Sequence, residues 1–266
     1  MKVLICGDVV GKSGRLALKK NLPTLKKKEQ IDFVVVNGEN AASGFGITKK
    51  ICEEFYEMGI DVITTGNHIW DQREIIQHIE TDNRLIRPCN YPEKTPGRGF
   101  GIYEIGNGSI AVVINVMCRL YMDTIENPFL NLDRILDEIK LYASNCLIIV
   151  DVHGESTSEK MAIGHFLDGR VTAVVGTHTH IPTSDLQIME KGTFYQTDLG
   201  MCGDYNSIIG MKKEISLKRF LHKHLRTRLE PADGEGTVCG VILEIDLETK
   251  KVKNFKQLIN GGFLGV

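Results

Sequence analysis

The sequence predicts an α/β protein in which two β-sheets pack together with helices on the outside. Three observations point to this fold class: the first half alternates strands and helices, the middle contains a β-hairpin, and the end is rich in strands. No linker separates the two halves. We therefore expect residues 1–266 to form a single domain.

The sequence pattern of the first half predicts three units, each a strand followed by a helix. The expected strands are Lys2–Cys6, Phe33–Val36 and Val62–Thr64, and the expected helices are Arg15–Lys28, Thr48–Met58 and Gln72–Glu80. We expect Thr48 to cap the second helix and Gly59 to end it. Strands joined by helices of this length favour right-handed crossovers and a parallel sheet.

The pattern changes in the middle of the chain. Pro88, Pro92, Pro96 and Gly97 mark a long loop, and then Phe100–Ile105 and Ile110–Met117 predict a hairpin closed by Gly106-Asn107-Gly108-Ser109. The remaining expected helices are Leu132–Ala143 and Ser158–Leu167. The remaining expected strands are Leu147–Asp151, Ala173–Gly176, Leu186–Met189, Phe194–Gln196, Val238–Asp246 and Val252–Leu258.

Composition excludes several classes of protein. Hydrophobic residues make up 42% and charged residues 25% of the chain, which is ordinary for a globular protein and excludes a disordered chain or a coiled coil. The net charge of −2 does not indicate nucleic acid or an anionic membrane as a partner. No apolar run approaches the ~20 residues of a membrane span, and the N-terminal apolar stretch is too short for a signal peptide.

Cysteine usage points to the cytoplasm. The 7 Cys are an odd number, no two form a CxxC pair, and several lie in apolar runs. We therefore expect reduced thiols in the core, rather than a disulfide framework or a zinc knuckle.

Polar residues that can bind metals follow five of the predicted strands. The segments are Gly7-Asp8, Gly38-Glu39-Asn40, Gly66-Asn67-His68, Asp151-Val152-His153 and Gly176-Thr177-His178-Thr179-His180. Each residue alone has an ordinary explanation, such as a helix cap, a turn or a solvated loop. Because ligands bind at the carboxyl ends of parallel strands, the joint occurrence favours one site.

Among these residues, His178 and His180 give the strongest indication of a shared metal site. In extended backbone, residues two apart point to the same side, so both imidazoles would face one site. Together with the carboxylates and amides, imidazole suits Fe, Mn, Zn or Co better than Ca or Mg. Ions in a two-metal site lie ~3.5–4 Å apart, so one ligand should bridge them, and Glu39 is the candidate.

These residues, in this order, resemble the calcineurin-like metallophosphoesterases, and more closely the bacterial YmdB group, which hydrolyses cyclic nucleotides. The resemblance runs from Gly7-Asp8-Val9-Val10-Gly11 through the Gly-Thr-His-Thr-His segment to Asp198-Leu199-Gly200-Met201 and Ile209-Gly210-Met211. It implies a four-layer α/β/β/α sandwich of two mixed sheets. Two departures from the wider superfamily, the missing His in Asp8-Val9-Val10 and Gly38-Glu39-Asn40 in place of Gly-Asp, are shared by the closer group.

The resemblance also implies residue roles. The first metal would be held by Asp8, Glu39, Asn40 and His180, and the second by Glu39, Asn67, His153 and His178. His68 would approach the leaving-group oxygen as an acid or a hydrogen-bond donor. The expected cofactors are two transition-metal ions per chain, Fe or Mn in the first place and Zn or Co as alternatives. The predicted function is therefore hydrolysis of small nucleotide phosphoesters, 2′,3′- or 3′,5′-cyclic, by attack of a metal-bridging hydroxide.

Two other functions remain open from the sequence. Gly7-x-x-x-Gly11-Lys12-Ser13 resembles a P-loop of a nucleotide-binding phosphotransferase, although its spacing is one residue short. The basic segment 212–228 would suit a non-catalytic regulator that binds RNA or a nucleotide, but a solvated basic face explains it more simply. Just before it, Tyr205 is a candidate to stack on a substrate base. The sequence leaves a homo-oligomer open.

Overall fold

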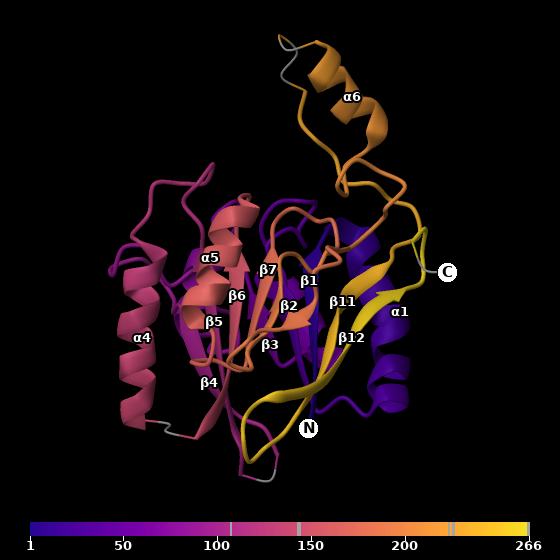
Figure 1. The fold of residues 1–266 in the computed structure, drawn as a ribbon. Coiled ribbons are helices and arrows are strands. Elements are labelled where there is room, and N and C mark those ends of the chain that lie inside the picture. The colour runs from indigo at the N-terminus through magenta and orange to yellow at the C-terminus, as the bar shows by residue number, and fades with distance from the viewer. Residues whose placement is uncertain (107, 143–144, 223, 225–226, 265–266) are drawn as a thin grey trace.

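The computed structural model describes all residues except 107, 143–144, 223, 225–226 and 265–266. Two six-stranded sheets pack face to face, and helices cover both outer faces (Figure 1). The structure confirms the α/β class. None of the helices among the described residues is both long and apolar enough to cross a bilayer.

The first sheet has the strand order β12-β11-β1-β2-β3, and β10 pairs with β1. Its strands are β1 (Lys2–Val9), β2 (Phe33–Asn37), β3 (Val62–Thr64), β10 (Met201–Cys202), β11 (Val238–Ile245) and β12 (Val252–Asn260). β1, β2 and β3 are parallel, as the strand–helix alternation predicts, whereas β11 and β12 are antiparallel to their neighbours.

The second sheet has the order β4-β5-β6-β7-β9-β8. Its strands are β4 (Phe100–Glu104), β5 (Ile110–Met117), β6 (Cys146–His153), β7 (Ala173–Thr177), β8 (Gln187–Ile188) and β9 (Phe194–Gln196). β4 and β5 form the predicted antiparallel hairpin, and β5, β6, β7 and β9 are parallel. Asn107 of the hairpin turn lies outside the described residues.

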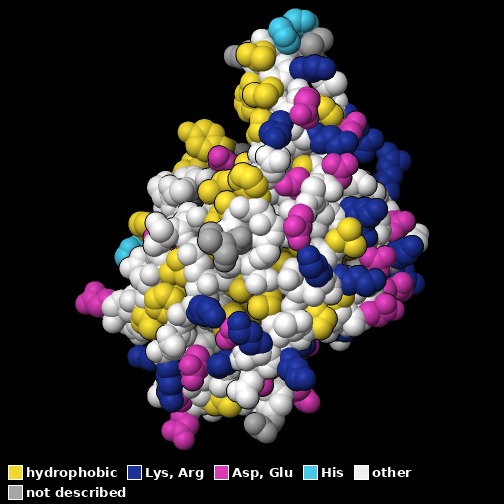
Figure 2. Space-filling model, turned by 90° about the vertical axis from the view of Figure 1, so that its right-hand side faces the viewer, with side chains coloured by type: hydrophobic (Ala, Val, Ile, Leu, Met, Phe, Trp, Pro, Cys, Tyr) yellow, Lys and Arg dark blue, Asp and Glu magenta, His cyan; other side chains and the backbone are white. Residues whose placement is uncertain are grey.

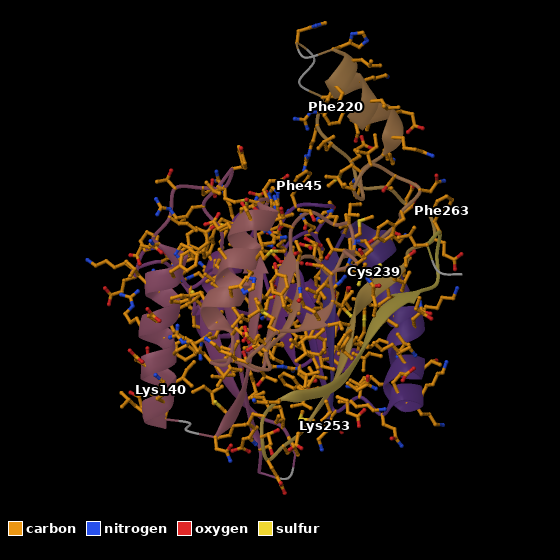
Figure 3. The ribbon with its side chains drawn as sticks, in the orientation of Figure 1. Phe45, Lys140, Phe220, Cys239, Lys253 and Phe263 are labelled. Carbon is orange, nitrogen blue, oxygen red and sulfur yellow. The ribbon has the colours of Figure 1, made fainter. Side chains whose placement is uncertain are left out.

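Helices complete the outer layers. Beside the first sheet lie α1 (Gly11–Glu29), α2 (Lys49–Glu57) and α3 (Ile75–Thr81), and beside the second lie α4 (Pro128–Tyr142) and α5 (Thr157–Leu167). A further helix, α6 (Lys213–Leu221), projects from the body of the molecule (Figure 1). The stick view shows Phe220 on this projection and Phe45 at the upper edge of the body (Figure 3).

Strand alternation explains the layers. In β1, Val3 and Ile5 belong to the apolar cluster between the sheets, whereas Leu4 and Cys6 face the helices. β5 repeats the pattern on the other sheet, with Ala111 and Val113 inward. Because successive side chains of a strand point to opposite faces, both sheets are buried on two sides. The three resulting apolar layers confirm the four-layer α/β/β/α sandwich.

Most element boundaries agree with the sequence prediction, with several differences. β1 continues to Val9, so Asp8 lies inside the strand rather than after it. The third helix begins at Ile75 rather than Gln72, and β8 is shorter than predicted. β10 and α6 were not predicted from the sequence. The predicted helix end at Ala143 lies outside the described residues.

Local signals behave as expected around α2. The Thr48 side chain accepts a hydrogen bond from the Ile51 amide at 3.3 Å, which caps the helix. Gly59 has φ of +83°, the left-handed conformation that commonly ends a helix. Six of the seven cysteines, all except Cys89, are buried, as the prediction of core cysteines requires.

Candidate metal centre

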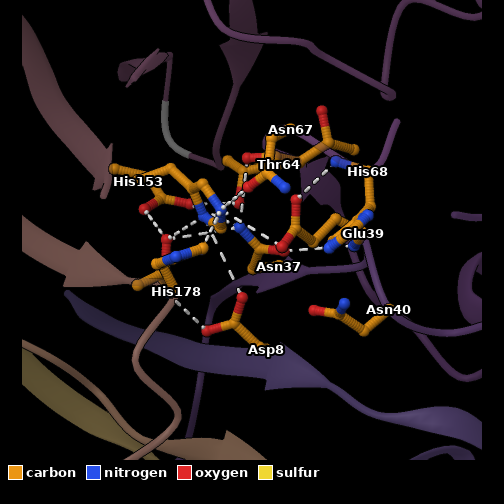
Figure 4. A network of polar contacts seen from close by, with 12 residues as sticks. Asp8, Asn37, Glu39, Asn40, Thr64, Asn67, His68, His153 and His178 are labelled. Atoms are coloured by element: carbon orange, nitrogen blue, oxygen red, sulfur yellow. Dashed lines mark hydrogen bonds and ion pairs between the residues drawn. The ribbon is translucent and has the colours of Figure 1, made fainter. Parts of the chain in front are cut away.

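The five polar segments meet at one edge of the sandwich. β1 and β6 carry their donors within the last residues of the strand, and β2, β3 and β7 are followed by theirs (Figure 4). The residues brought together are Asp8, Glu39, Asn40, Asn67, His68, His153, His178 and His180. These are the eight catalytic and metal-ligand candidates that the sequence singles out.

Gly66 allows the two sheets to approach each other at this edge. A Cβ atom at this position would lie 2.3 Å from His153 Nε2 and 2.4 Å from Glu39 Oε2. These distances leave no space for any side chain, so only glycine fits beside the site.

Three atoms crowd around one imidazole nitrogen. Glu39 Oε1, Asn67 Oδ1 and His178 Nδ1 each lie 3.1 Å from His153 Nε2. A ring nitrogen carries at most one proton, so it cannot donate hydrogen bonds to all three. Ligand atoms of Glu39, His153 and His178 lie within 4.8 Å of one another, which allows them to share a cation. The crowding fits a metal ion better than a hydrogen-bond network.

A second group of donors lies beside the first. Asp8 Oδ1 and Asn40 Oδ1 are both buried without a hydrogen-bond partner. The Asn40 amide nitrogen donates to the Gly44 carbonyl at 3.1 Å, which fixes the side chain with its oxygen free. His180 Nε2 lies 3.9 Å from Asp8 Oδ1. Unpaired buried oxygens are costly, and a cation would satisfy both.

Each of the three histidines has its other ring nitrogen engaged. His153 Nδ1 contacts Thr177 Oγ1 at 2.9 Å, and His180 Nδ1 contacts the Ile209 carbonyl at 2.8 Å. His178 Nε2 lies 3.3 Å from Glu155 Oε2. Such outer contacts fix the ring orientation and the tautomer of a metal-binding histidine. The nitrogens left for a metal are therefore Nε2 of His153 and His180, and Nδ1 of His178.

Asp151 supports this arrangement from behind. Its buried carboxylate accepts hydrogen bonds from Thr64 at 2.5 Å, Thr177 at 2.8 Å and Asn37 at 3.2 Å. Because Thr177 also contacts His153, the network positions that imidazole. Burial raises the pKa of Asp151 despite these bonds.

Among the titratable groups of the site, Glu39 and His153 form the charged pair. Burial opposes ionisation of Glu39, but the adjacent His153 outweighs burial and lowers the pKa of Glu39 to about 2. Glu39 likewise outweighs the burial of His153 and raises the pKa of His153 to about 8. Burial and the charge of His153 lower the pKa of His178 to about 3. Burial raises the pKa of Asp8 to about 6.

The backbone at His178 and His180 is not extended. Their φ angles are +98° and +67°, so the extended geometry assumed from the sequence is wrong, although both side chains lie at the site. Asp8 Oδ2 accepts the His178 amide at 3.0 Å. Asp198 Oδ2 accepts the Thr179 amide at 3.1 Å. These carboxylates hold a left-handed conformation that non-glycine residues rarely adopt.

His68 lies at the solvent side of the centre. Its amide donates to Glu39 Oε2 at 3.1 Å, and its Nδ1 contacts Asp71 Oδ2 at 2.8 Å. Phe45 packs edge-on against the imidazole, with ring centroids 5.1 Å apart. These contacts orient the ring and leave Nε2 as the nitrogen that can meet a substrate.

Tyr205 acts on the loop that carries His180. Its hydroxyl donates to the His180 carbonyl at 3.0 Å and accepts the Met201 amide at 2.7 Å. Burial raises the pKa of this phenol, so it remains protonated. The hydroxyl thus has a positioning role, and base stacking by the ring stays a prediction.

The structure has no phosphate-binding loop between β1 and α1, as a P-loop would require. β1 runs to Val9 and α1 begins at Gly11, so one residue separates the strand from the helix. A P-loop needs a longer glycine-rich turn whose amides surround a phosphate. The spacing that was one residue short in the sequence thus corresponds to a direct strand-to-helix connection.

Within its described residues, the basic segment 212–228 mixes basic side chains with acidic and apolar ones. Lys212 pairs with Glu230 at 3.1 Å, and Lys213 contacts Asn206 at 2.9 Å. Figure 2 shows basic, acidic and apolar side chains side by side on the projecting arm. Lys223 and Arg226 of this segment lie outside the described residues.

The comparisons with known proteins agree with the geometry. Residues 4–258 match the family model described as YmdB-like protein. The chain belongs to the YmdB-like family. It is 44% identical to the 2′,3′-cyclic-nucleotide 2′-phosphodiesterase of Bacillus subtilis, over 97% of both chains.

Two solved structures of the same kind are similar throughout. A hypothetical protein of Thermus thermophilus is 41% identical with a TM-score of 0.91, covering 97% of this chain and 98% of the other. A phosphatase of Mycoplasma pneumoniae is 36% identical with a TM-score of 0.89, covering 97% and 92%. The overall fold of this chain is therefore also that of these two proteins.

Proposed function

We propose that this protein is a metal-dependent phosphodiesterase that hydrolyses small nucleotide phosphoesters, with 2′,3′-cyclic nucleotides as the first candidate substrates. The coarser statement rests on its relatives: they are named phosphodiesterase or phosphatase, and the chain is a phosphoric ester hydrolase. The choice of substrate rests on the name of the Bacillus subtilis relative.

One observation carries the metal dependence. Asp8 Oδ1 and Asn40 Oδ1 are buried without partners beside a nitrogen that three other donors crowd. A cation would satisfy these oxygen and nitrogen lone pairs together, which supports a metal at this point. We assign one ion to Asp8, Glu39, Asn40 and His180. We assign the other to Glu39, Asn67, His153 and His178, with Glu39 shared.

The donor types support transition metals. Imidazole nitrogens with carboxylate and amide oxygens suit Fe or Mn, with Zn or Co as alternatives. When bound, such ions polarise phosphoryl oxygens and lower the pKa of water. Two carboxylates, Asp8 and Glu39, cannot neutralise two divalent ions. The centre therefore retains positive charge, which attracts a phosphate diester.

The chain's own residues then orient the substrate and move the proton. His68 is placed at the solvent side of Glu39, with Nδ1 fixed by Asp71 at 2.8 Å. From this position His68 Nε2 donates a proton or hydrogen bond to the departing sugar oxygen. Glu39 accepts the His68 amide at 3.1 Å, so the acid and the shared ligand keep a fixed separation.

The test combines metal analysis with a substrate panel. Protein purified without chelator is assayed on 2′,3′-cyclic AMP, 3′,5′-cyclic AMP and an aryl phosphodiester, before and after chelation. We expect close to two metal ions per chain, hydrolysis of the 2′,3′-cyclic nucleotide, and loss of activity on chelation that added metal restores. Full activity in demonstrably metal-free protein would overturn the metal assignment. Inactivity on all phosphodiesters in metal-replete protein would overturn the function.

A further inference from the structure

A second cluster of metal-binding side chains lies apart from the metal centre, between two outer helices. Cys52 belongs to α2, His78 to α3, and Asp82 follows α3 directly. Their ligand atoms all lie within 4.8 Å of one another. None of these residues contributes to the phosphodiesterase site described above.

The imidazole of His78 is not satisfied by its neighbour. His78 Nε2 lies 2.9 Å from Asp82 Oδ2, yet this buried nitrogen has no hydrogen-bond partner of acceptable geometry. A ring nitrogen forms hydrogen bonds in the plane of its ring, and such a bond weakens steeply when its partner lies away from that direction. The nitrogen is therefore close to the carboxylate but directed toward a different point.

The carboxylate is fixed from outside the cluster. Asp82 Oδ2 accepts the Tyr56 hydroxyl at 2.7 Å, and Asp82 Oδ1 accepts the Arg84 amide at 2.9 Å. Arg84 also stacks over the Tyr56 ring at 3.9 Å, which holds both residues in place. Metal ligands in proteins are typically oriented by such outer contacts.

The Cys52 thiol is the third possible metal ligand of this cluster and its most deeply buried one. Cys52 is fully buried, while the side chains of His78 and Asp82 are 15% and 7% exposed. Burial, and secondarily the charge of Asp82, raise the pKa of the Cys52 thiol well above its usual range. In the absence of a cation the sulfur is a protonated thiol. The exposed edges of His78 and Asp82 give an ion a way in.

We propose that Cys52, His78 and Asp82 bind a zinc ion that joins α2 to α3. Sulfur, imidazole and carboxylate together are characteristic Zn²⁺ ligands, and water would fill the fourth tetrahedral position. On binding, the thiol proton is released to solvent and the thiolate sulfur takes its place at the metal, so charge and protons balance.

The location gives this ion a consequence for the metal centre. α2 follows the segment that carries Glu39 and Asn40, and α3 follows the segment that carries Asn67 and His68. The Lys49 amide at the start of α2 already donates to Glu74, just before α3, at 3.3 Å. An ion at Cys52 would add a second link between these helices, and thereby restrain the two ligand-bearing loops.

Cobalt substitution tests the proposal. The metal centre offers only nitrogen and oxygen ligands, so a thiolate-to-cobalt charge-transfer absorption reports on a cysteine site alone. Metal-free protein is titrated with Co²⁺, and the near-ultraviolet absorption is recorded. We expect the band in the wild type, its loss in Cys52→Ser and His78→Gln, and its retention in Cys118→Ser, another buried cysteine.

Zinc content provides the second readout. After dialysis against Zn²⁺, the wild type should retain one more zinc ion per chain than Cys52→Ser. Absence of the cobalt band in the wild type overturns the proposal, whatever the variants do. Its persistence in Cys52→Ser would assign the band to another cysteine and also overturn it. Cyclic-nucleotide hydrolysis by Cys52→Ser tests the proposed function separately, because this variant leaves every candidate ligand of the metal centre intact.

Discussion

The first sheet delivers carboxylates and amides to the candidate metal centre, whereas the second sheet delivers imidazoles. Asp8, Glu39, Asn40 and Asn67 come from β1, β2 and β3, and His153, His178 and His180 come from β6 and β7. Neither sheet alone offers both kinds of metal ligand. The first sheet supplies oxygen donors that include two negatively charged carboxylates, and the second supplies nitrogen donors that carry no negative charge. A complete N/O site therefore exists only where the two sheets meet.

The two sheets also present their donors by different backbone devices. The donors of the first sheet lie at strand ends beside glycines such as Gly66. His178 and His180 instead require left-handed backbone, which Asp8 and Asp198 stabilise through hydrogen bonds. The oxygen donors of the first sheet are thus positioned by local backbone structure, whereas the positions of His178 and His180 depend on contacts with residues distant in the sequence.

Removing one donor from each sheet gives the largest expected effect. Asn67→Ala and His178→Ala each remove a candidate ligand of the same ion, so metal content and turnover should fall together. Loss of several kcal/mol of transition-state stabilisation corresponds to roughly a 10³-fold fall in kcat/KM. Metal analysis and kinetics on the same preparations measure both, and circular dichroism checks that the fold survives.

His165→Ala is the matched control, because His165 is an exposed histidine on α5. It should retain wild-type metal content and turnover. Two bound metals and normal turnover in either Asn67→Ala or His178→Ala would show that the ligand assignment is wrong on that sheet.

His68→Ala should separate proton donation from metal binding. General acid catalysis contributes ~10²–10⁴-fold, and the need for it falls with a better leaving group. The variant should keep its metals, lose much activity on a cyclic nucleotide, and lose much less on an aryl phosphodiester. Equal losses on both substrates with metals intact would indicate phosphate positioning. Loss of metal would make His68 a ligand or a support.

Glu155→Gln tests the outer contact of the imidazole side, with a smaller effect. Glu155 Oε2 lies 3.3 Å from His178 Nε2. Removing such a partner of a metal-binding histidine typically costs 10–100-fold in affinity or activity. We expect weaker metal retention on dialysis and a fall of that order in kcat/KM. Glu190→Gln, at an exposed glutamate, is the control. Identical behaviour of the two variants would exclude a positioning role for Glu155.

Chelation should lower the free energy of unfolding, because in the proposed site the ions join the two sheets. A ligand present at 100 times its Kd stabilises the native state by about 2.7 kcal/mol. At about 2–4 °C per kcal/mol, the melting temperature should fall by roughly 5–10 °C. Differential scanning calorimetry with and without bound metal measures the shift. An unchanged Tm in protein freed of metal would contradict a bridge between the sheets.

Much of the first sheet could be predicted from sequence, because its signals are local. Alternation places β1, β2 and β3, and Thr48 and Gly59 bound α2 as expected. Glu39 and Asn67, each preceded by a glycine, lie two and three residues after the ends of β2 and β3. β10 escaped prediction because its two residues are too few to show alternation. α6 escaped because its residues form no apolar stripe buried in the core.

The histidines of the second sheet could be identified from the sequence, but their backbone conformation could not. Nothing in the sequence neighbours of His178 indicates a positive φ, since Asp8 stabilises it from 170 positions away. Glu155 carried no signal, because a single exposed glutamate after a strand has many ordinary roles. The pairing of Cys52 with His78 and Asp82 depends on how α2 and α3 pack, although the i, i+4 spacing of His78 and Asp82 is a local hint.

Segment 197–200 is hydrogen-bonded to both sheets. Gly200 O accepts the Asp8 amide at 3.2 Å, and the Leu199 amide donates to Gly176 at 2.9 Å. A Cβ at Gly7 or Gly176 would lie 1.8 Å from this segment's carbonyl oxygens. A residue larger than glycine at position 7 or 176 would therefore displace this segment. Because Asp8 and His178 follow these two glycines within two residues, main-chain packing sets the spacing between the two halves of the candidate site.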